Sequence, residues 1–133
     1  MLVIDKISRK PIYEQIVEGI EREIVTGIMG ELEQLPSIRE LSNLLGINPN
    51  TIQKALIELD RAGIIVSMPG RGCFVAQNAR QKIRERLTSK IAAIREMSVE
   101  LANAGIDEQA VFEAVHAAYE QVGAGSGGKD QKL

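Results

Sequence analysis

Apolar positions recur at helical spacing in the first half of the chain and predict three short helices. The first covers residues 12–26, where isoleucines repeat every four positions at Ile12, Ile16, Ile20 and Ile24. The second begins at Ser37 and has an apolar face made of Ile38, Leu41, Leu44 and Leu45. The third follows Asn48 and has a buried stripe made of Ile52, Ala55, Leu56 and Leu59. Each stripe has the period of an amphipathic helix packed on a core.

Strong local signals mark the ends of these helices. Pro11 suits the first position of the first helix, because it has no N–H to lose there. Ser37 opens a capping-box sequence, Ser-Ile-Arg-Glu, and Gly46 can leave the second helix with a positive φ. Asn48 and Pro49 are a favourable N-cap and first helical residue for the third helix. Two capped helices joined by so short a turn are typical of a helix-turn-helix.

The period changes at residues 64–76, where two short β-prone runs flank the turn Pro69-Gly70-Arg71-Gly72. This pattern predicts a β-hairpin with a basic tip. The predicted fold of residues 1–77 is therefore mainly α with a small β-hairpin, a winged helix-turn-helix.

The second half of the chain predicts a separate two-helix module over residues 78–122, followed by a flexible tail over 123–133. One long amphipathic helix is expected over 79–103, and a second helix is expected after an Asp107 cap. A hairpin of two such helices leaves apolar surface exposed, so a second copy of the chain is its natural cover. The residues predicted to form this dimer interface are Ile83, Leu87, Ile91, Ile94, Leu101, Val111, Val115 and Val122.

Composition excludes several classes of protein. No apolar run is long enough to span a bilayer, and the first residues lack the apolar stretch of a signal peptide. A single cysteine, Cys73, cannot form an intrachain disulfide, which fits a cytoplasmic location. With only one histidine, His116, no metal cluster or catalytic dyad can be assembled. We therefore expect no enzyme activity, no cofactor, no metal and no membrane association.

The third predicted helix carries the candidate chemistry on its polar face. Asn50, Gln53 and Lys54 share this face near the helix start, with Thr51 beside them. Recognition helices present their first residues to base edges, and Asn or Gln can bind adenine through two hydrogen bonds. An ordinary solvated face is the usual alternative, but the capped helix before it and the basic hairpin after it favour DNA.

Two arginines are further candidates for contacts with DNA. Arg71 lies between two glycines at the hairpin tip, where it could approach a phosphate or a minor groove, or remain a solvated turn residue. Arg39 lies in the first turn of the second helix and could bind a phosphate or guanine, or pair with a nearby Glu. The net charge of −2 argues against DNA binding through bulk charge. It favours a rival interpretation, a winged helix that docks a protein partner and binds no DNA.

Residues 35–75, "LPSIRELSNLLGINPNTIQKALIELDRAGIIVSMPGRGCFV", resemble the GntR family of bacterial transcription regulators. With "PIYEQIVEGIEREIVTG" the resemblance covers about residues 6–76. The short segment after the wing is similar to the YtrA subfamily, which has a minimal dimerisation appendage. The resemblance implies a homodimeric repressor of an operon, which in that subfamily often encodes an ABC transporter, and a double-stranded DNA operator with an inverted repeat. It leaves the small-molecule effector unknown.

The resemblance also implies which residues contact DNA. Carried over one by one, these contacts fall on Arg39, Asn48, Asn50, Thr51, Gln53, Gly70 and Arg71. Many relatives have Arg in the positions of Pro49 and Gln53, so this chain lacks two cationic contacts. Asn50 and Gln53 are therefore the main candidates for base recognition.

Overall fold

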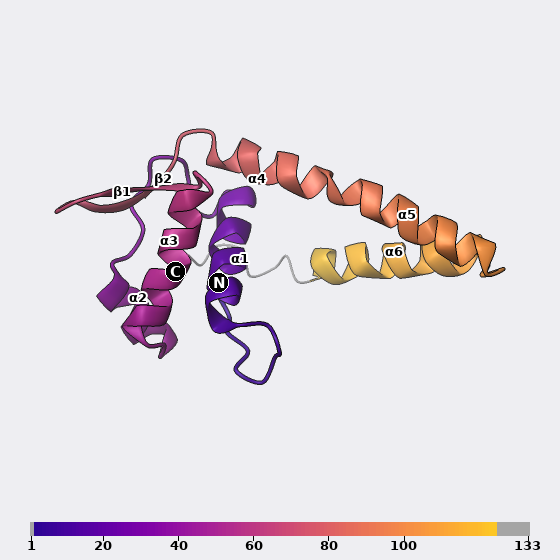
Figure 1. Cartoon of the computed structure of the whole chain (residues 1–133), viewed down its shortest axis with the longest axis horizontal. Helices are drawn as coiled ribbons and strands as arrows, with labels where there is room; N and C mark the ends of the chain where they lie inside the picture. Colours follow the sequence, from indigo (N-terminus) through magenta and orange to yellow (C-terminus); the bar gives the residue numbers. More distant parts are fainter. Residues whose placement is uncertain (1, 125–133) are drawn as a thin grey trace. The chain divides into compact units, whose positions relative to one another are not determined.

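The computed structural model describes residues 2–124, which fold mainly as helices with one β-hairpin (Figure 1). The elements are α1 (Ile12–Val25), α2 (Ile38–Leu45), α3 (Pro49–Arg61), β1 (Ile65–Met68), β2 (Gly72–Val75), α4 (Ala79–Thr88), α5 (Lys90–Asn103) and α6 (Glu108–Ala124). The described residues divide into two compact units, the first ending at Arg84 and the second beginning at Glu85. The predicted fold class, a winged helix-turn-helix followed by helices, is confirmed.

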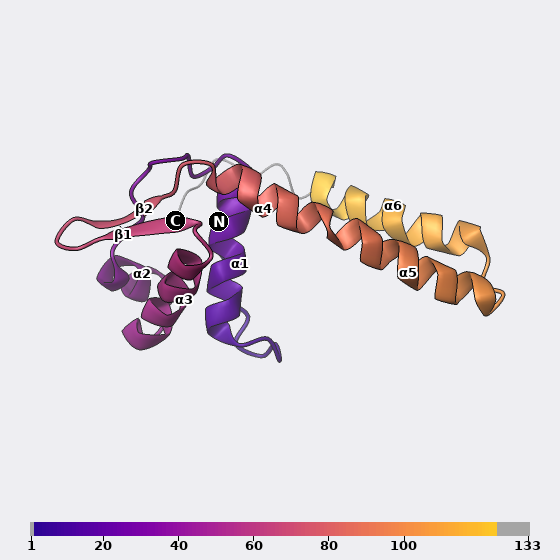
Figure 2. The same cartoon turned by 45° about the horizontal axis from the view of Figure 1, so that its top comes forward.

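The core of the first unit is built from the predicted apolar stripes. In both views α3 lies between α1 and α2 and packs against both (Figure 1 and Figure 2). The largest fully buried side chains of this core are Ile16, Ile20, Ile24, Leu41, Ile52, Leu59, Ile65, Val75 and Ile83. Burial of such a side chain stabilises the fold by about 1.5–3 kcal/mol. The prediction that Leu44 belongs to the buried face of α2 was wrong, because Leu44 is 58% exposed.

The helix ends confirm most of the local signals. The Ser37 hydroxyl accepts a hydrogen bond from the Glu40 backbone N–H at 3.0 Å, and the Glu40 carboxylate accepts one from the Ser37 N–H at 3.4 Å. Gly46 ends α2 with φ +66°, and Asn48 caps α3. Pro11 differs from the prediction, since it is the N-cap of α1, with an extended ψ of 145°, and not its first helical residue.

The wing is an antiparallel hairpin with a third backbone segment along its edge. β1 and β2 pair from Ile65 opposite Val75 to Met68 opposite Gly72. Residues 32–35 run along the other edge of β2. The Leu32 and Leu35 N–H groups donate to the Val75 and Cys73 carbonyls, each at 2.8 Å. The wing is therefore hydrogen-bonded on both sides of β2.

The boundary between the two units lies further along the chain than the expected residue 77. Ala79 and Ile83 of α4 are 0% and 1% exposed and belong to the core of the first unit. Ile83 is therefore a correction to the predicted dimer interface, because its own chain already covers it. Periodicity placed Ile83 on the same stripe as Leu87 and Ile91, but the first turns of α4 pack on the winged helix.

The second unit contains an antiparallel pair, α5 and α6, which lie side by side in Figure 1 and Figure 2. The single helix predicted over 79–103 is interrupted at Ser89, whose hydroxyl donates to the Arg86 carbonyl at 2.6 Å. As predicted, Asp107 caps α6 by accepting from the Gln109 N–H at 3.4 Å. The predicted tail over 123–133 lies outside the described residues except for Gly123 and Ala124, which end α6.

Candidate nucleic-acid interface

The start of α3 presents the residues predicted to read bases. Asn50 and Gln53 are exposed and Thr51 is half-buried, while Ile52 on the opposite face has no exposed surface. The capped turn before α3 fixes its first residues, so these side chains project from a rigid backbone. The geometry suits the insertion of α3 into a groove, since no core contact competes for the two exposed amides.

Asn48, which the resemblance implies to be a DNA contact, also caps α3. Its side-chain oxygen accepts a hydrogen bond from the Asn50 backbone N–H at 2.8 Å. This bond satisfies one of the free N–H groups at the start of α3. The NH2 group of the Asn48 side chain is the part that can still donate to a phosphate or base.

Lys54 is oriented by a contact that the sequence did not reveal. Its ammonium nitrogen lies 4.0 Å from the ring centroid of Tyr13, a half-buried residue in the first turn of α1. The Tyr13 hydroxyl donates to the Glu14 carboxylate at 3.3 Å. Partial burial and the nearby Glu14 and Glu58 carboxylates raise the pKa of Tyr13 above its usual value. The Tyr13 ring therefore limits where the charge of Lys54 can lie.

We expect Tyr13→Leu to weaken DNA binding by at most about 1.5–2 kcal/mol, the cost of ordering a free Lys side chain. Without the ring, Lys54 loses its preferred orientation and must be ordered when it binds DNA. Tyr13→Phe keeps the ring and is the matched control, with affinity expected to be close to that of the wild type. Fluorescence anisotropy with labelled DNA measures both variants. Tighter binding by Tyr13→Leu would show that the ring competes with DNA for Lys54.

The wing tip brings backbone and one arginine to the surface. Gly70 and Gly72 have φ of +76° and +111°, a region that other residues rarely adopt. The Arg71 carbonyl accepts a hydrogen bond from the Gln34 side chain at 2.8 Å, and the Arg71 side chain remains exposed. A Cβ atom on Gly72 would lie 2.8 Å from the Gln34 amide nitrogen. Glycine is therefore favoured at position 72 by its φ, whereas the end of the flexible Gln34 side chain could shift to make room for a Cβ atom.

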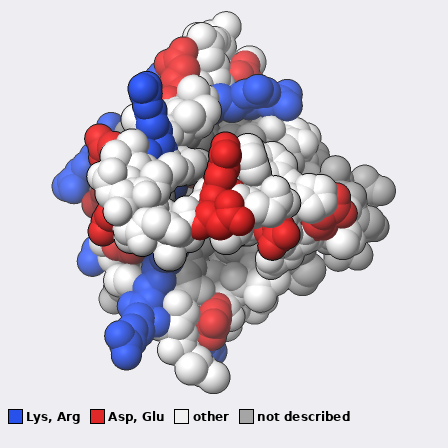
Figure 3. All heavy atoms as spheres, turned by 90° about the vertical axis from the view of Figure 1, so that its right-hand side faces the viewer, with Lys and Arg blue, Asp and Glu red and all other residues white. Residues whose placement is uncertain are grey.

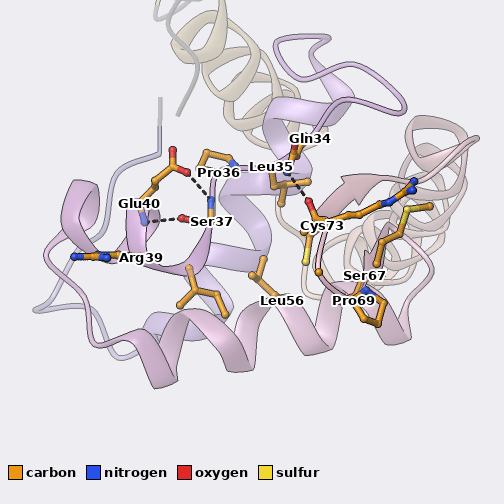
Figure 4. Close-up of a pocket in the computed structure, with 15 residues that line it drawn as sticks. Gln34, Leu35, Pro36, Ser37, Arg39, Glu40, Leu56, Ser67, Pro69 and Cys73 are labelled. Carbon is orange, nitrogen blue, oxygen red and sulfur yellow. Dashed lines mark hydrogen bonds between the residues drawn. The ribbon is translucent and has the colours of Figure 1, made fainter.

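A groove of about 790 Å³ lies between the start of α2 and the wing. Figure 4 shows Leu35 and Leu56 among its lining residues, with Ser67 and Pro69 on the wing side. Arg39 projects from α2 away from the wing (Figure 4). Arg39 and Arg71 both line this groove, Arg39 from α2 and Arg71 from the wing. Both arginines are exposed, and exposed arginines suit contacts with phosphates.

Charge is mixed on the face shown in Figure 3, where blue cationic and red acidic side chains are interspersed among uncharged atoms. With a net charge of −2, attraction to a polyanion has to come from local groups. Among the described residues, no helix is both long enough and apolar enough to cross a membrane.

Comparison with known proteins identifies the family. Residues 12–75 match the family model described as "Bacterial regulatory proteins, gntR family". The HTH-type transcriptional repressor YtrA of Bacillus subtilis (strain 168) is 36% identical over 114 residues, which are 85% of this chain and 88% of that protein.

Solved structures agree with this assignment. A GntR family transcriptional regulator from Listeria monocytogenes aligns with a TM-score of 0.69 and 31% identity, over 86% of this chain and 98% of that one. AraR(DBD), solved in complex with operator ORE1, aligns with a TM-score of 0.50 and 30% identity, over 57% of this chain and 93% of that one. The chain therefore belongs to the GntR family of bacterial regulatory proteins and is of the YtrA type.

Proposed function

We propose that this GntR-family regulator is a homodimeric repressor that binds an inverted-repeat operator in double-stranded DNA. The observation that carries the proposal is the capped start of α3, which leaves Asn50 and Gln53 exposed. The similar AraR(DBD) was solved with operator DNA, and the similar YtrA of Bacillus subtilis is named a repressor. Both relatives support the same class of function.

Within this proposal, the amides and the cations have different roles. Asn50 and Gln53 read bases, because an amide can donate to and accept from one adenine edge. Arg39, Lys54 and Arg71 bind phosphates and position the protein without reading sequence. The remaining predicted contacts are the hydroxyl of Thr51, the donor N–H groups of Asn48 and the backbone at Gly70.

The α5–α6 pair supports dimerisation, because none of its described residues is buried within the chain. The exposed large apolar side chains of α5, α6 and the turn between them are Ile91, Ile94, Met97, Val99, Leu101, Ile106, Phe112, Val115, Tyr119 and Val122. Apolar surface of this extent marks an interface. Leu87 at the end of α4 is 40% exposed and joins it, and Val111 is half-buried. Phe112 and Tyr119 extend the predicted interface, which had included only the valines of α6.

A two-fold dimer binds two half-sites of opposite direction, which predicts an inverted repeat. Control of an ABC-transporter operon and a cytoplasmic location stay predictions. A gene for such a transporter beside the gene for this chain, with an inverted repeat in the shared promoter, would support the first of them.

A salt titration separates the proposed function from the rival protein-docking module. DNA affinity should fall steeply as salt rises, because each neutralised phosphate releases a counterion and contributes about −0.9 to the slope of log K against log salt. The probe is a duplex selected by the full chain from a randomised pool, with a scrambled duplex as control. A chain that shows no saturable binding to either duplex is not a DNA-binding repressor.

Replacing Gln53 by Ala should cost about 1–3 kcal/mol of binding free energy on the selected duplex. The loss should be confined to one base pair per half-site, since a bidentate amide reads a single base. Competition against duplexes substituted at each position measures this preference. Equal losses on selected and scrambled duplexes would remove Gln53 from the base-reading residues.

A further inference from the structure

The segment before α1 forms a basic loop with a defined shape, although it packs on nothing apolar. Residues 5–10, Asp-Lys-Ile-Ser-Arg-Lys, are all exposed, and Ile7 reaches 94% exposure. Three cations and one carboxylate give the loop a net charge of +2, while the whole chain has −2. This local charge was not singled out by the sequence pattern.

Gln15 of α1 holds this loop through both ends of its amide. Its nitrogen donates to the Asp5 and Lys10 carbonyls at 2.9 and 3.0 Å, and its oxygen accepts from the Asp5 N–H at 2.8 Å. Inside the loop, Asp5 and Ser8 accept from the Ile7 and Lys10 N–H groups at 2.9 and 3.2 Å. The loop is therefore ordered by polar contacts that expose its cations.

The cations of the loop differ in what they contact. Lys10 pairs with Glu18 of α1 at 2.8 Å, so a carboxylate already lies beside its charge. Lys6 and Arg9 are exposed, and the Asp5 carboxylate is turned into the loop by its bond to Ile7. Lys6 and Arg9 are therefore the two groups that the loop presents outward.

The loop lies at the end of the first unit where α3 begins. In both views the indigo loop is beside the start of α1, at the same end of the unit as the turn between α2 and α3 (Figure 1 and Figure 2). The 4.0 Å contact between Lys54 and the Tyr13 ring joins the starts of α1 and α3 directly. Since α3 lies between α2 and α1, the loop flanks α3 on the side away from α2.

We propose that this loop is an additional DNA-binding element, in which Lys6 and Arg9 bind phosphates beside the groove that α3 enters. The proposal rests on the proposed function, because it takes α3 as the helix that enters the groove. The chemical partner is the sugar–phosphate backbone of double-stranded DNA, whose spacing of charges requires cations and no sequence. The loop then adds affinity that is independent of base sequence.

The test compares two double variants of the full chain that remove the same charge. Lys6→Gln with Arg9→Gln should reduce the salt slope by about 0.9 for each lost contact and lower affinity at least about tenfold, equally on the selected and scrambled duplexes. The control is Arg22→Gln with Arg80→Gln, which changes the last turn of α1 and the first turn of α4. This control should keep the wild-type slope, and circular dichroism verifies that both variants are folded.

Gln15→Ala tests whether the shape of the loop matters in addition to its charge. It keeps every cation but removes the three bonds between Gln15 and the loop, so affinity should fall by less than in the Lys6 and Arg9 variant. If the wild type binds DNA with a steep salt slope and the Lys6 and Arg9 variant matches it, the loop proposal is overturned alone. If the wild type binds neither duplex, the proposed function itself fails.

Discussion

Removal of the chain from Glu85 onward is expected to leave a folded monomer that binds operator DNA at least about 10²-fold more weakly than the full chain. The core cluster of buried apolar side chains lies entirely before Glu85, so the winged helix keeps all of it. What is lost is the link between two half-site contacts. In a dimer the second contact forms at an effective concentration that can reach millimolar, and the truncated chain has no such gain.

Sedimentation equilibrium and anisotropy titrations measure the two parts of this prediction. A second truncation, after residue 77, is an informative comparison, because it also removes Ala79 and Ile83 from the core. That shorter chain should unfold more easily than the one ending at Arg84. A chain ending at Arg84 that still dimerises, or binds as tightly as the full chain, would place the dimer interface in the winged helix.

Replacement of Ile83 by Ala should lower the free energy of unfolding by about 2–5 kcal/mol, the usual cost of a buried Ile to Ala change. Ile83 is 1% exposed in the core of the first unit. The loss should be the same at every protein concentration, because the contacts of Ile83 lie within one chain. Urea denaturation followed by circular dichroism, repeated over a range of concentrations, measures it.

Ile91→Ala is the matched control for this prediction. Ile91 is 63% exposed and belongs to the proposed dimer interface. Its replacement should weaken dimerisation and so reduce the dependence of stability on protein concentration. If Ile83→Ala weakens the dimer and leaves the unfolding free energy of the first unit unchanged, the assignment of Ile83 to the core is wrong.

The helix ends of the first unit were predictable because each depends on a few adjacent residues. Ser37 with Glu40, Gly46, and Asn48 with Pro49 all act over a single turn of chain. The apolar stripes were predictable for a similar reason, since helical periodicity states which side chains share a face. The winged-helix fold follows from these two kinds of local signal taken together.

The element or chain that packs on an apolar helix face could not be predicted from periodicity. Ile83 and Ile91 share one predicted stripe, yet the first is buried in its own chain and the second is exposed. The exposure of Leu44 has the same origin, because α2 is short and only part of its apolar face meets α3. Periodicity contains no information on the partner that a face meets.

The candidate site was predictable as a set of residue types on α3 and at the wing tip, and their contacts with DNA remain proposals. The contact of Lys54 with Tyr13 and the bonds from Gln15 to Asp5 depend on the packing and geometry of folded elements. Lys54 and Tyr13 are far apart in the sequence and meet only through the packing of α1 on α3. Such contacts need the fold before they can be seen.

The backbone bonds between residues 32–35 and β2 have a mechanical consequence. These residues run directly into Ser37 at the start of α2, so the wing cannot swing away from α2 without breaking them. The span from Arg39 to Arg71 is then stiff, and the DNA has to adjust to it. Narrowing or bending a duplex costs different amounts in different sequences. We therefore expect the operator to favour particular base pairs between the contacts of α3 and the wing, chosen for their deformability although no side chain touches them.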